Sequence, residues 1–352
     1  MPGRKPGVRR ILRVDDDPSA VVRIVTASKP GIRGDSRIGL SAALRSAAVW
    51  DVQGARADRV RIVVTGAGGF VGRPLCAALR AGGHRVTAVV RQLPAQPLAS
   101  DRVVAVGDLA TGPDWTGVLD GADCVVHLAG RAHVRDDGDG DAAERAYFAA
   151  NVGATETVVH AARTAGVRRI VYISSIKVNG ERTFGRPFRH DDVASPEDAY
   201  GRSKARAEEI VRAASSPAFE TVILRPPLIY GPGVRGNIAT LFGWAARGLP
   251  LPLASIANRR DLVGVSNFVS LIGAALAHPA AAGGTFLARD GEPVSTPALY
   301  AAIAEAMGRR ARLFPCPPSL LKLAGRLTGR GDTIAKLTGD LEVDDTATRH
   351  AP

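Results

Sequence analysis

The feature that most constrains the fold is a short β-branched run leading into a glycine-rich loop, Val-Arg-Ile-Val-Val-Thr-Gly-Ala-Gly-Gly-Phe-Val-Gly at residues 60–72. The apolar half predicts a buried strand of a parallel sheet, and a helical pattern follows at residues 73–81. Gly66 permits a tight turn, Gly69 lets backbone N–H groups approach a pyrophosphate, and Gly72 lets the helix pack closely on the strand. An ordinary glycine-rich turn is the alternative, but the strand and helix on either side favour a dinucleotide site at the N-terminus of the helix.

Strands and helices alternate downstream of this loop. Short apolar runs predict strands at residues 85–90, 102–106, 123–128, 169–174 and 220–224, and helical patterns cover residues 141–164 and 199–214. Alternation of this kind is typical of βαβ units. We therefore expect an α/β fold in which residues 59–225 form a Rossmann-type, doubly wound parallel sheet.

The pattern changes after residue 225, where glycine and proline become frequent. Helical patterns recur at residues 238–247, 268–277, 297–307 and 318–327. They predict a smaller, mainly helical substrate lobe over residues 226–352, interleaved with the Rossmann core. We expect this lobe to pack against the carboxyl ends of the strands, where ligands bind in open α/β sheets.

Residues 1–58 are expected to be a disordered basic extension that lies outside the folded protein, because they mix Arg, Asp, Gly and Pro with no sustained period. Residues 1–60 contain twelve Lys and Arg against six Asp and Glu, and so carry half of the net charge of +12. Few aromatic residues accompany the basic ones, so binding to nucleic acid is not expected.

The cysteine content and the hydropathy of the chain indicate the kind of cellular compartment in which the protein works. Cys76, Cys124 and Cys316 are few and widely spaced, which predicts neither a disulfide framework nor a metal site. A reducing cytoplasm is the compartment that fits such a chain. No run of 18 apolar residues exists, so no transmembrane segment is predicted.

Three residues form the strongest candidate for catalysis. Tyr200 and Lys204 are four apart in a helical segment, so the phenol and the ammonium share one face. A nearby ammonium favours the phenolate, so we expect a lowered pKa at Tyr200 and a general base near neutral pH. Ser175 follows the strand at residues 169–174, where its hydroxyl is placed to hydrogen-bond a substrate oxygen. Taken by themselves, Tyr200 and Lys204 could equally be a half-buried pair on the protein surface. The order of the motifs along the chain, with the glycine loop first, then the serine, then the tyrosine and lysine, favours a catalytic role.

These motifs occur together with several others from residue 60 onward. They include His-Leu-Ala-Gly at 127–130, Asn-Val-Gly-Ala-Thr at 151–155, Ser-Ser at 174–175, Leu-Arg-Pro-Pro at 224–227, Tyr-Gly-Pro at 230–232 and Arg-Arg-Asp-Leu-Val at 259–263. With them the chain resembles the extended short-chain dehydrogenase/reductase superfamily, and within it the NAD-dependent epimerase/dehydratase family of nucleotide-sugar enzymes. Ser-Ser-Ile-Lys-Val-Asn-Gly at 174–180 is similar to a subfamily of bacterial polysaccharide-pathway epimerases and 4-keto-sugar reductases.

The resemblance implies a role for each matching residue. Tyr200 would be the general acid/base, Lys204 its ammonium partner, and Ser175 the active serine, with Ser174 as the second choice. The dinucleotide would be bound by Gly66, Gly69, Phe70, Val71, Gly72, Arg91, Asp108, Leu109, Leu128, Ala129, Gly130, Tyr200, Lys204 and Pro227. The substrate would be bound by Ser175, Lys177, Asn237 and Arg260, the last because a guanidinium suits a diphosphate. Asn151 and His127 match positions with a structural role.

The sequence departs from the family pattern at several positions. Arg91 lies where an NAD enzyme has an acidic residue for the ribose 2′-hydroxyl. An arginine there suits a 2′-phosphate, so Arg91 favours NADP while the family favours NAD. Leu228 replaces an asparagine of many UDP-galactose-type epimerases, and Gly264 and Ser266 stand where the subfamily tends to have Tyr and Asp. The chain stops at Pro352, where relatives continue, so a shortened C-terminus is also expected.

The resemblance implies a nucleotide-sugar 4-epimerase of the UDP-glucose or UDP-N-acetylhexosamine type, which oxidises C4 transiently at a Ser/Tyr/Lys site. One alternative is an NADPH-dependent reductase of a UDP-4-keto-6-deoxy sugar in surface-polysaccharide synthesis, which Arg91 and Leu228 favour. A non-catalytic dinucleotide-binding protein is a third interpretation, although such relatives usually lack the Tyr or the Lys. A fourth is action on steroid-like alcohols, which Arg260 disfavours. The expected partner is a nucleotide sugar, and the family commonly forms homodimers through a helix pair.

Overall fold

The computed structural model describes residues 59–132, 140–234 and 236–349. The expected extension, residues 1–58, lies outside the described residues. Among those that are described, no helix combines the length and the apolar character that crossing a bilayer requires.

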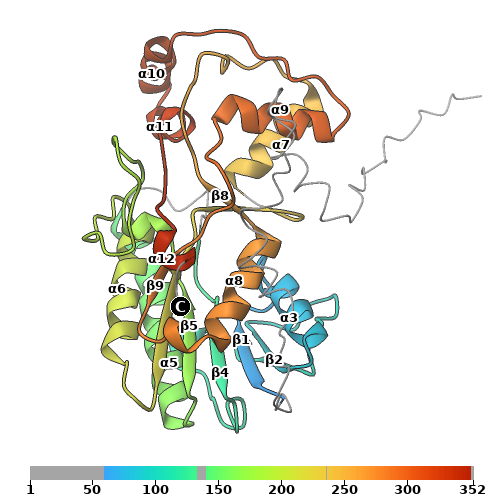
Figure 1. Ribbon diagram of the computed structural model, residues 1–352, viewed down its shortest axis with the longest axis vertical. Coiled ribbons are helices and arrows are strands. Elements are labelled where there is room, and N and C mark those ends of the chain that lie inside the picture. Colours follow the sequence, from blue (N-terminus) through green and yellow to red (C-terminus); the bar gives the residue numbers. More distant parts are fainter. Residues whose placement is uncertain (1–58, 133–139, 235, 350–352) are drawn as a thin grey trace, which may run out of the picture.

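A seven-stranded parallel sheet forms the centre of the molecule (Figure 1). Its strand order is β3-β2-β1-β4-β5-β6-β9, and the first six strands follow the doubly wound order of dinucleotide-binding folds. The strands are β1 (Arg61–Thr65), β2 (Arg85–Val90), β3 (Arg102–Ala105), β4 (Cys124–His127), β5 (Arg169–Ile173), β6 (Glu220–Arg225) and β9 (Thr285–Leu287). The fold class and the six strands predicted before residue 226 are confirmed.

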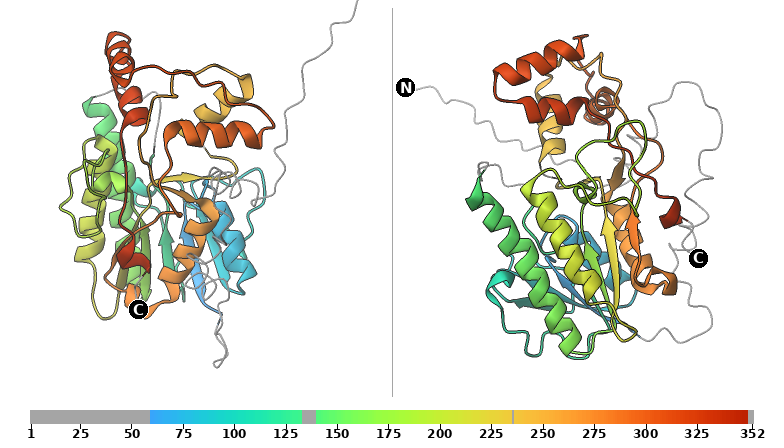
Figure 2. Two further views of the ribbon diagram at one scale, coloured as in Figure 1. Left: turned by 45° about the horizontal axis from the view of Figure 1, so that its top comes forward. Right: turned by 90° about the vertical axis from the view of Figure 1, so that its left-hand side faces the viewer.

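Helices cover both faces of this sheet, because successive residues of each buried strand point to opposite sides. Val64 and Val126 pack on one face with the helix α3 (Gly72–Ala81), whereas Val63 and Val125 pack on the other. The second face is covered by α4 (Asp141–Phe148), α5 (Ala154–Thr164) and α6 (Ala199–Ala213); Figure 2 shows α4 and α5 end to end, with α6 beside them. The helix predicted over residues 141–164 is interrupted between α4 and α5 by a π-helical turn, η2 (Ala149–Gly153).

The segment 265–287 belongs to the sheet layers. We placed the helix of residues 268–277 in the smaller lobe, but α8 (Val265–Ala277) lies beside α3 on the sheet (Figure 1). Phe268 and Ile272 are fully buried there in the same cluster as the strands. The strand β9 then pairs with β6 and adds a seventh strand. Apolar periodicity predicted the helix correctly but carried no information on which layer its buried face would meet.

The smaller lobe lies beyond the carboxyl ends of the strands. At its base β7 (Leu228–Tyr230) pairs in parallel with β8 (Leu262–Gly264). Above it are α7 (Asn237–Arg247), α9 (Thr296–Ala306), α10 (Pro318–Leu327) and α11 (Gly331–Thr338), and α12 (Thr346–Arg349) returns to the side of β9. The short helices η1 (Leu109–Thr111), η3 (Ile176–Val178) and η4 (Pro279–Ala281) complete the described elements.

Candidate active site

The glycine loop between β1 and α3 forms the turn that its spacing predicts. Gly66 has φ of +69°, and a Cβ there would lie 2.7 Å from the backbone nitrogen of Ala129, which follows β4. A side chain at Gly72 would collide with the carbonyl oxygen of Gly66 and with Ala67. The close contact of Gly72 is therefore with the turn itself, where we had expected contact with the strand. Both glycines let three backbone segments meet at the carboxyl edge of the sheet.

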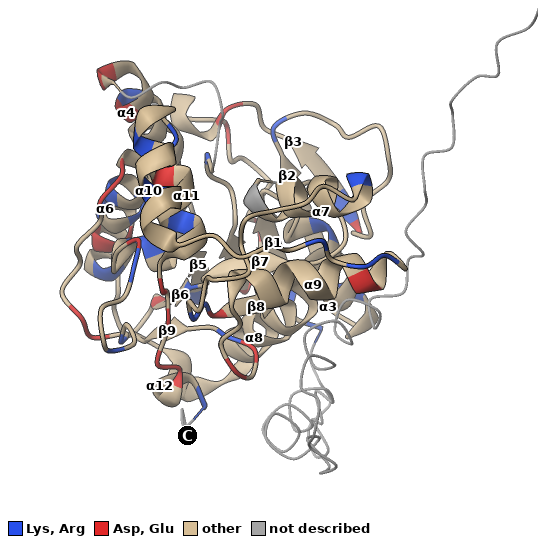
Figure 3. Cartoon of the chain, turned by 90° about the horizontal axis from the view of Figure 1, so that it is seen from above, with Lys and Arg blue, Asp and Glu red and all other residues tan. Residues whose placement is uncertain are grey.

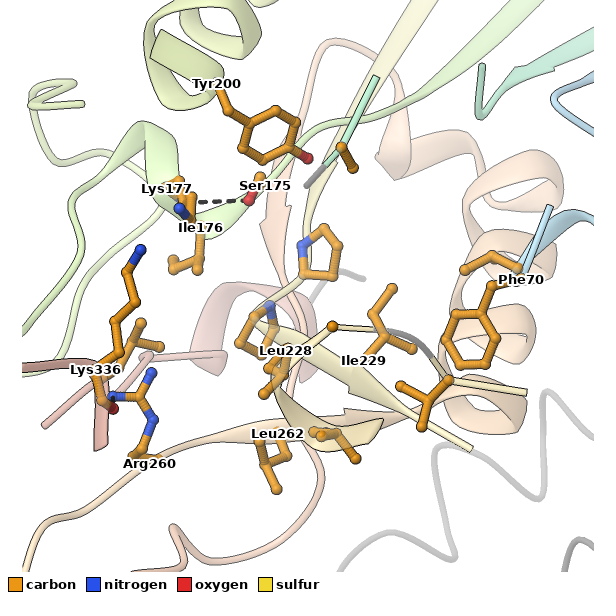
Figure 4. Close-up of a pocket in the computed structure, with 18 of the residues that line it drawn as sticks. Phe70, Ser175, Ile176, Lys177, Tyr200, Leu228, Ile229, Arg260, Leu262 and Lys336 are labelled. Atoms are coloured by element: carbon orange, nitrogen blue, oxygen red, sulfur yellow. Dashed lines mark hydrogen bonds between the residues drawn. The ribbon is translucent and has the colours of Figure 1, made fainter. Parts of the chain in front are cut away.

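A cavity of about 760 Å³ runs from this loop to the smaller lobe. Its wall contains most of the residues that the sequence assigned to cofactor or substrate: Gly66, Gly69, Phe70, Val71, Gly72, Leu128, Gly130, Ser175, Lys177, Tyr200, Lys204, Pro227 and Arg260. Figure 4 shows Phe70 at one end, Arg260 and Lys336 at the other, and Ser175 with Tyr200 between them. The tertiary structure thus gathers the dinucleotide loop and the candidate catalytic residues around one space.

The two adjacent serines have different partners. Ser175 caps η3, where its Oγ accepts a 3.3 Å hydrogen bond from the Lys177 backbone N–H, and its side chain lies close to that of Tyr200. Ser174 is buried and donates its hydroxyl to Oε1 of Glu208 at 2.5 Å. Because the Ser174 hydroxyl is already bound to the buried Glu208, Ser175 is the better placed of the two serines to contact a substrate.

Tyr200 differs from expectation in its acidity. Burial raises the pKa of Tyr200 to about 12, although the nearby Ser175 side chain and the charge of Lys177 act in the opposite direction. We had expected a lowered pKa caused by Lys204. The expectation was wrong because the protein removes water from around the phenolate, and this loss outweighs the attraction of the nearby cation.

Lys204 lies one helical turn from Tyr200 but points to a different partner. Its Nζ donates a 2.7 Å hydrogen bond to the carbonyl oxygen of Ile173, and it lies 4.5 Å from the centre of the Tyr172 ring. Burial lowers the pKa of Lys204 to about 7, against an opposing effect of Glu208. The i, i+4 spacing placed both side chains on the cavity wall, as predicted, without making Lys204 the cation that acts on Tyr200.

Lys177 is the cation beside Tyr200, with its Nζ 5.8 Å from the centre of the Tyr200 ring. It binds Asp198 and Glu181 at 2.5 and 2.6 Å. Asp198 caps α6 by accepting a 2.7 Å hydrogen bond from the Gly201 N–H. Lys177 therefore ties the turn that carries Ser175 to the first turn of the helix that carries Tyr200. The sequence offered a signal for this link, because an aspartate two residues before Tyr200 is a typical N-cap.

Charge dominates the surroundings of Lys177. Burial alone would lower its pKa, but Glu181 and Asp198 raise it above the ordinary value, so the side chain stays an ammonium. Glu181 also faces Lys336 of α11 at 4.0 Å. A chain of charges thus connects the candidate catalytic residues with the smaller lobe.

Arg260 lies in the wall of the cavity at the lobe end. It donates hydrogen bonds of 2.9 Å to the carbonyl oxygens of Lys336 and Gly339, which hold the C-terminal end of α11. Burial lowers its pKa, while Glu181 and Asp340 act in the opposite direction. Arg260 therefore positions α11 in addition to facing the cavity. Asn237 is the first residue of α7, and its side chain lies outside the described part of the chain.

Four residues assigned to the dinucleotide are not among those that line the cavity: Arg91, Asp108, Leu109 and Ala129. Arg91 is exposed directly after β2, and Asp108 caps η1 by accepting a 3.0 Å hydrogen bond from the Ala110 N–H. Leu109 is buried against the sheet, and Ala129 supplies the backbone that faces Gly66. Their roles toward a dinucleotide remain predictions.

Asn151 and His127 have structural partners. Asn151 lies in the π-helical turn, where its Oδ1 accepts from the Arg131 N–H at 2.8 Å and its Nδ2 donates to Ser203 at 2.8 Å. His127 is buried between Thr65 and Thr155. Burial, followed by the charge of Lys204, lowers the pKa of His127 to about 3, so its ring is neutral. Asn151 therefore braces the loop beyond β4, whereas His127 links β4 to β1 and α5.

Comparisons with known proteins agree with this architecture. Residues 62–287 match the model of the NAD dependent epimerase/dehydratase family. A UDP-glucose 4-epimerase of Vibrio cholerae is 39% identical over 292 residues, which cover 82% of this chain and 88% of the relative. A 2-alkyl-3-oxoalkanoate reductase of Stenotrophomonas maltophilia is 32% identical over 267 residues, which cover 71% and 76% of the two chains.

A solved structure of MoeE5 in complex with UDP-glucuronic acid and NAD superposes with a TM-score of 0.63 at 29% identity. The match covers 73% of this chain and 85% of MoeE5. The family match spans more than half of the chain and includes β5, β6, the helix of Tyr200 and all of β1 except Arg61. The chain therefore belongs to the NAD dependent epimerase/dehydratase family.

Proposed function

We propose that the protein is a nucleotide-sugar 4-epimerase that interconverts UDP-hexoses through a transient 4-keto sugar. The observation that carries the proposal is that the glycine loop, Ser175, Tyr200 and Arg260 all line one cavity. The similarity to the UDP-glucose 4-epimerase of Vibrio cholerae supports the reaction. The MoeE5 complex with UDP-glucuronic acid and NAD supports both the substrate class and the cofactor.

The residues present fit a nicotinamide dinucleotide. The turn at Gly66 has no room for a side chain, and the cavity that begins there extends to Tyr200 and Lys204. The glycine loop would hold the pyrophosphate, and Lys204 would hold the nicotinamide ribose. When bound, the dinucleotide supplies an acceptor and donor of hydride at the sugar carbon.

Side chains of the protein carry out the proton transfer. Tyr200 takes the proton of the C4 hydroxyl, and Ser175 donates a hydrogen bond to the C4 oxygen. The 4-keto sugar then turns over in the cavity, which presents the opposite face of C4 to the returning hydride, and Tyr200 gives the proton back to the C4 oxygen. At the other end, Arg260 and Lys336 attract the diphosphate of the nucleotide.

The proposal is tested by incubating the protein and NAD with UDP-glucose and, separately, UDP-N-acetylglucosamine, with the products resolved by NMR. We expect the C4 epimer to form with no net consumption of the dinucleotide. Failure to epimerise either sugar, together with stoichiometric oxidation of NADPH by a UDP-4-keto-6-deoxy sugar, would overturn the epimerase and establish the reductase.

The reductase is retained as the second candidate because Arg91 is exposed at the carboxyl end of β2, the position from which a strand end reaches the adenosine ribose. If Arg91 binds a 2′-phosphate, Arg91→Ala should weaken NADPH binding by about 10–100-fold, because hydrogen bonds to charged groups contribute about 1.5–3 kcal/mol. NADH binding should change little. Isothermal titration calorimetry measures both constants.

Arg85→Ala is the matched control, since Arg85 is also exposed on β2 but at the opposite end of the strand. Equal losses for NADPH and NADH in Arg91→Ala would show that Arg91 does not discriminate between the two dinucleotides.

Because Lys177 lies beside Tyr200, replacing Lys177 should change how kcat/KM depends on pH. Because its charge lowers the pKa of Tyr200 against the effect of burial, Lys177→Met should raise that pKa. At any pH below the pKa, the phenolate fraction falls about tenfold when the pKa rises by one, so kcat/KM at neutral pH should fall in the same proportion. The rise of kcat/KM with pH should move to higher pH, whereas Lys177→Arg should keep the wild-type profile. A raised KM with an unchanged profile would instead make Lys177 a substrate ligand, as the sequence suggested.

A further inference from the structure

The helix α10 exposes a row of leucines on the outer face of the smaller lobe. Leu320, Leu323 and Leu327 have exposed fractions of 56%, 52% and 79%. Their spacing of three and four residues places them on one side of the helix. The opposing side of α10 packs against the lobe through Leu321 and Gly325. The leucine row is therefore a surface that the described part of the chain leaves uncovered.

The same stretch of chain is strongly basic. Residues 306–331 contain six basic side chains and no Asp or Glu: Arg309, Arg310, Arg312, Lys322, Arg326 and Arg330. All six are exposed, and none forms an ion pair with a described carboxylate. Figure 3 looks down on this face and shows Lys and Arg on α10 and on the chain that follows α9. Exposed leucine and uncompensated positive charge thus occur along the same stretch of chain.

This surface adjoins the cavity. The helix α10 packs on α11, where Gly325 meets Ile334 so closely that a Cβ would lie 2.7 Å from Cγ1. On its other side α11 contributes Asp332, Lys336 and Leu337 to the cavity wall. Figure 1 shows the α10–α11 pair at the end of the molecule farthest from the sheet. Whatever binds the leucine row lies one helix away from the substrate cavity.

We propose that α10 docks on the surface of an anionic phospholipid bilayer. Helices that lie in the interface of a membrane combine an exposed apolar strip with Lys and Arg beside it, and anionic lipid strengthens their binding. The leucines enter the boundary between headgroups and acyl chains, while Lys322 and Arg326 contact phosphates. The six basic groups match a negatively charged surface, and no carboxylate within residues 306–331 opposes that attraction. Docking would bring the α11 wall of the cavity next to the lipid headgroups.

The experiment is co-sedimentation of the full chain with vesicles of phosphatidylcholine, alone or mixed with phosphatidylglycerol. We expect binding to the mixed vesicles, weakened by added salt because the charges are exposed. Lys322→Glu should lower the partition coefficient by at least about fivefold, since each basic residue near an anionic surface contributes about that factor. Leu327→Glu should lower it further, by about tenfold or more, because a carboxylate replaces the most exposed leucine.

Leu93→Glu is the matched control, because Leu93 is 71% exposed on the Rossmann part of the chain. It should bind vesicles like the wild type, and all variants retain the basic residues 1–58. Both leucines are exposed, so each variant should keep the wild-type melting temperature. Equal binding of the wild type and Leu327→Glu would refute the proposal. If light scattering instead shows a dimer that Leu327→Glu dissociates without any change in vesicle binding, the leucine row is an interface between two copies.

Discussion

Replacing Tyr200 with phenylalanine is expected to lower the turnover number for epimerisation by about 10²–10⁴-fold, the range that one general acid/base contributes. Tyr200 lines the cavity beside Ser175 and is the proposed acceptor of the proton of the sugar hydroxyl. Removing one oxygen leaves the ring in place, so the dissociation constants of the dinucleotide and the sugar nucleotide should change by less than the rate. Single-turnover kinetics and calorimetry separate the two effects.

Tyr147→Phe is the control for this substitution. The ring of Tyr147 lies 5.9 Å from the ring of Tyr200, yet Tyr147 is not among the residues that line the cavity. Removing the hydroxyl of Tyr147 should therefore leave the turnover number within a few-fold of the wild type. If Tyr200→Phe turned over at the wild-type rate, the catalytic role would be excluded and a non-catalytic dinucleotide-binding protein would become the better interpretation.

The second large effect is expected on stability, from Glu208→Gln. Glu208 is fully buried and holds Arg225, which is 3% exposed, through two hydrogen bonds of 2.8 and 2.7 Å. Ser174 also donates to Glu208. An uncharged amide would leave the buried guanidinium without its counter-ion, so the free energy of unfolding should fall by about 3–5 kcal/mol. Urea denaturation measures the change.

Glu209→Gln is the control, because the neighbouring Glu209 is exposed and its ion pair with Arg206 is solvated. That substitution should change stability by at most about 0.5 kcal/mol. A loss below about 1 kcal/mol in Glu208→Gln would show that the buried pair contributes no more than a surface pair.

The loss of stability in Glu208→Gln should depend on pH in a defined direction. Burial alone would raise the pKa of Glu208, but Arg225, Ser174 and Arg212 lower it below its ordinary value. A carboxylate with a depressed folded-state pKa stabilises the protein above its unfolded-state pKa, and the contribution is lost as pH falls toward the folded-state value. The stability difference between wild type and Glu208→Gln should therefore be full at neutral pH and shrink in acid.

Much of the architecture was predictable from short-range patterns. The strands β1 to β6 are apolar runs of four to six residues, and their alternation with helices requires a parallel sheet. The glycine loop was identifiable because the spacing of Gly66, Gly69 and Gly72 has a local geometric cause. The family pattern likewise placed Ser175 and Tyr200 in one site, and in the structure both line the same cavity.

Other features depend on contacts between distant parts of the chain. The helix α8 shows its apolar periodicity in the sequence, but only the folded chain decides that it packs beside α3 on the sheet. The guanidinium of Arg260 was predicted to bind substrate, and the structure shows it also bound to the end of α11, nearly eighty residues away. No local pattern encodes either partner, because each is brought near by the whole fold.

The sequence by itself therefore determined the Rossmann-type sheet, the dinucleotide loop and the identity of the candidate catalytic residues. The tertiary structure decided their electrostatics. Spacing alone assigned Lys204 as the cation for Tyr200 and predicted a lowered phenol pKa, whereas the folded chain turns Lys204 to Ile173, places Lys177 beside the ring and raises the pKa. The physical reason is that a pKa depends on how much water surrounds a group and on the distance to every charge, and both are set by packing.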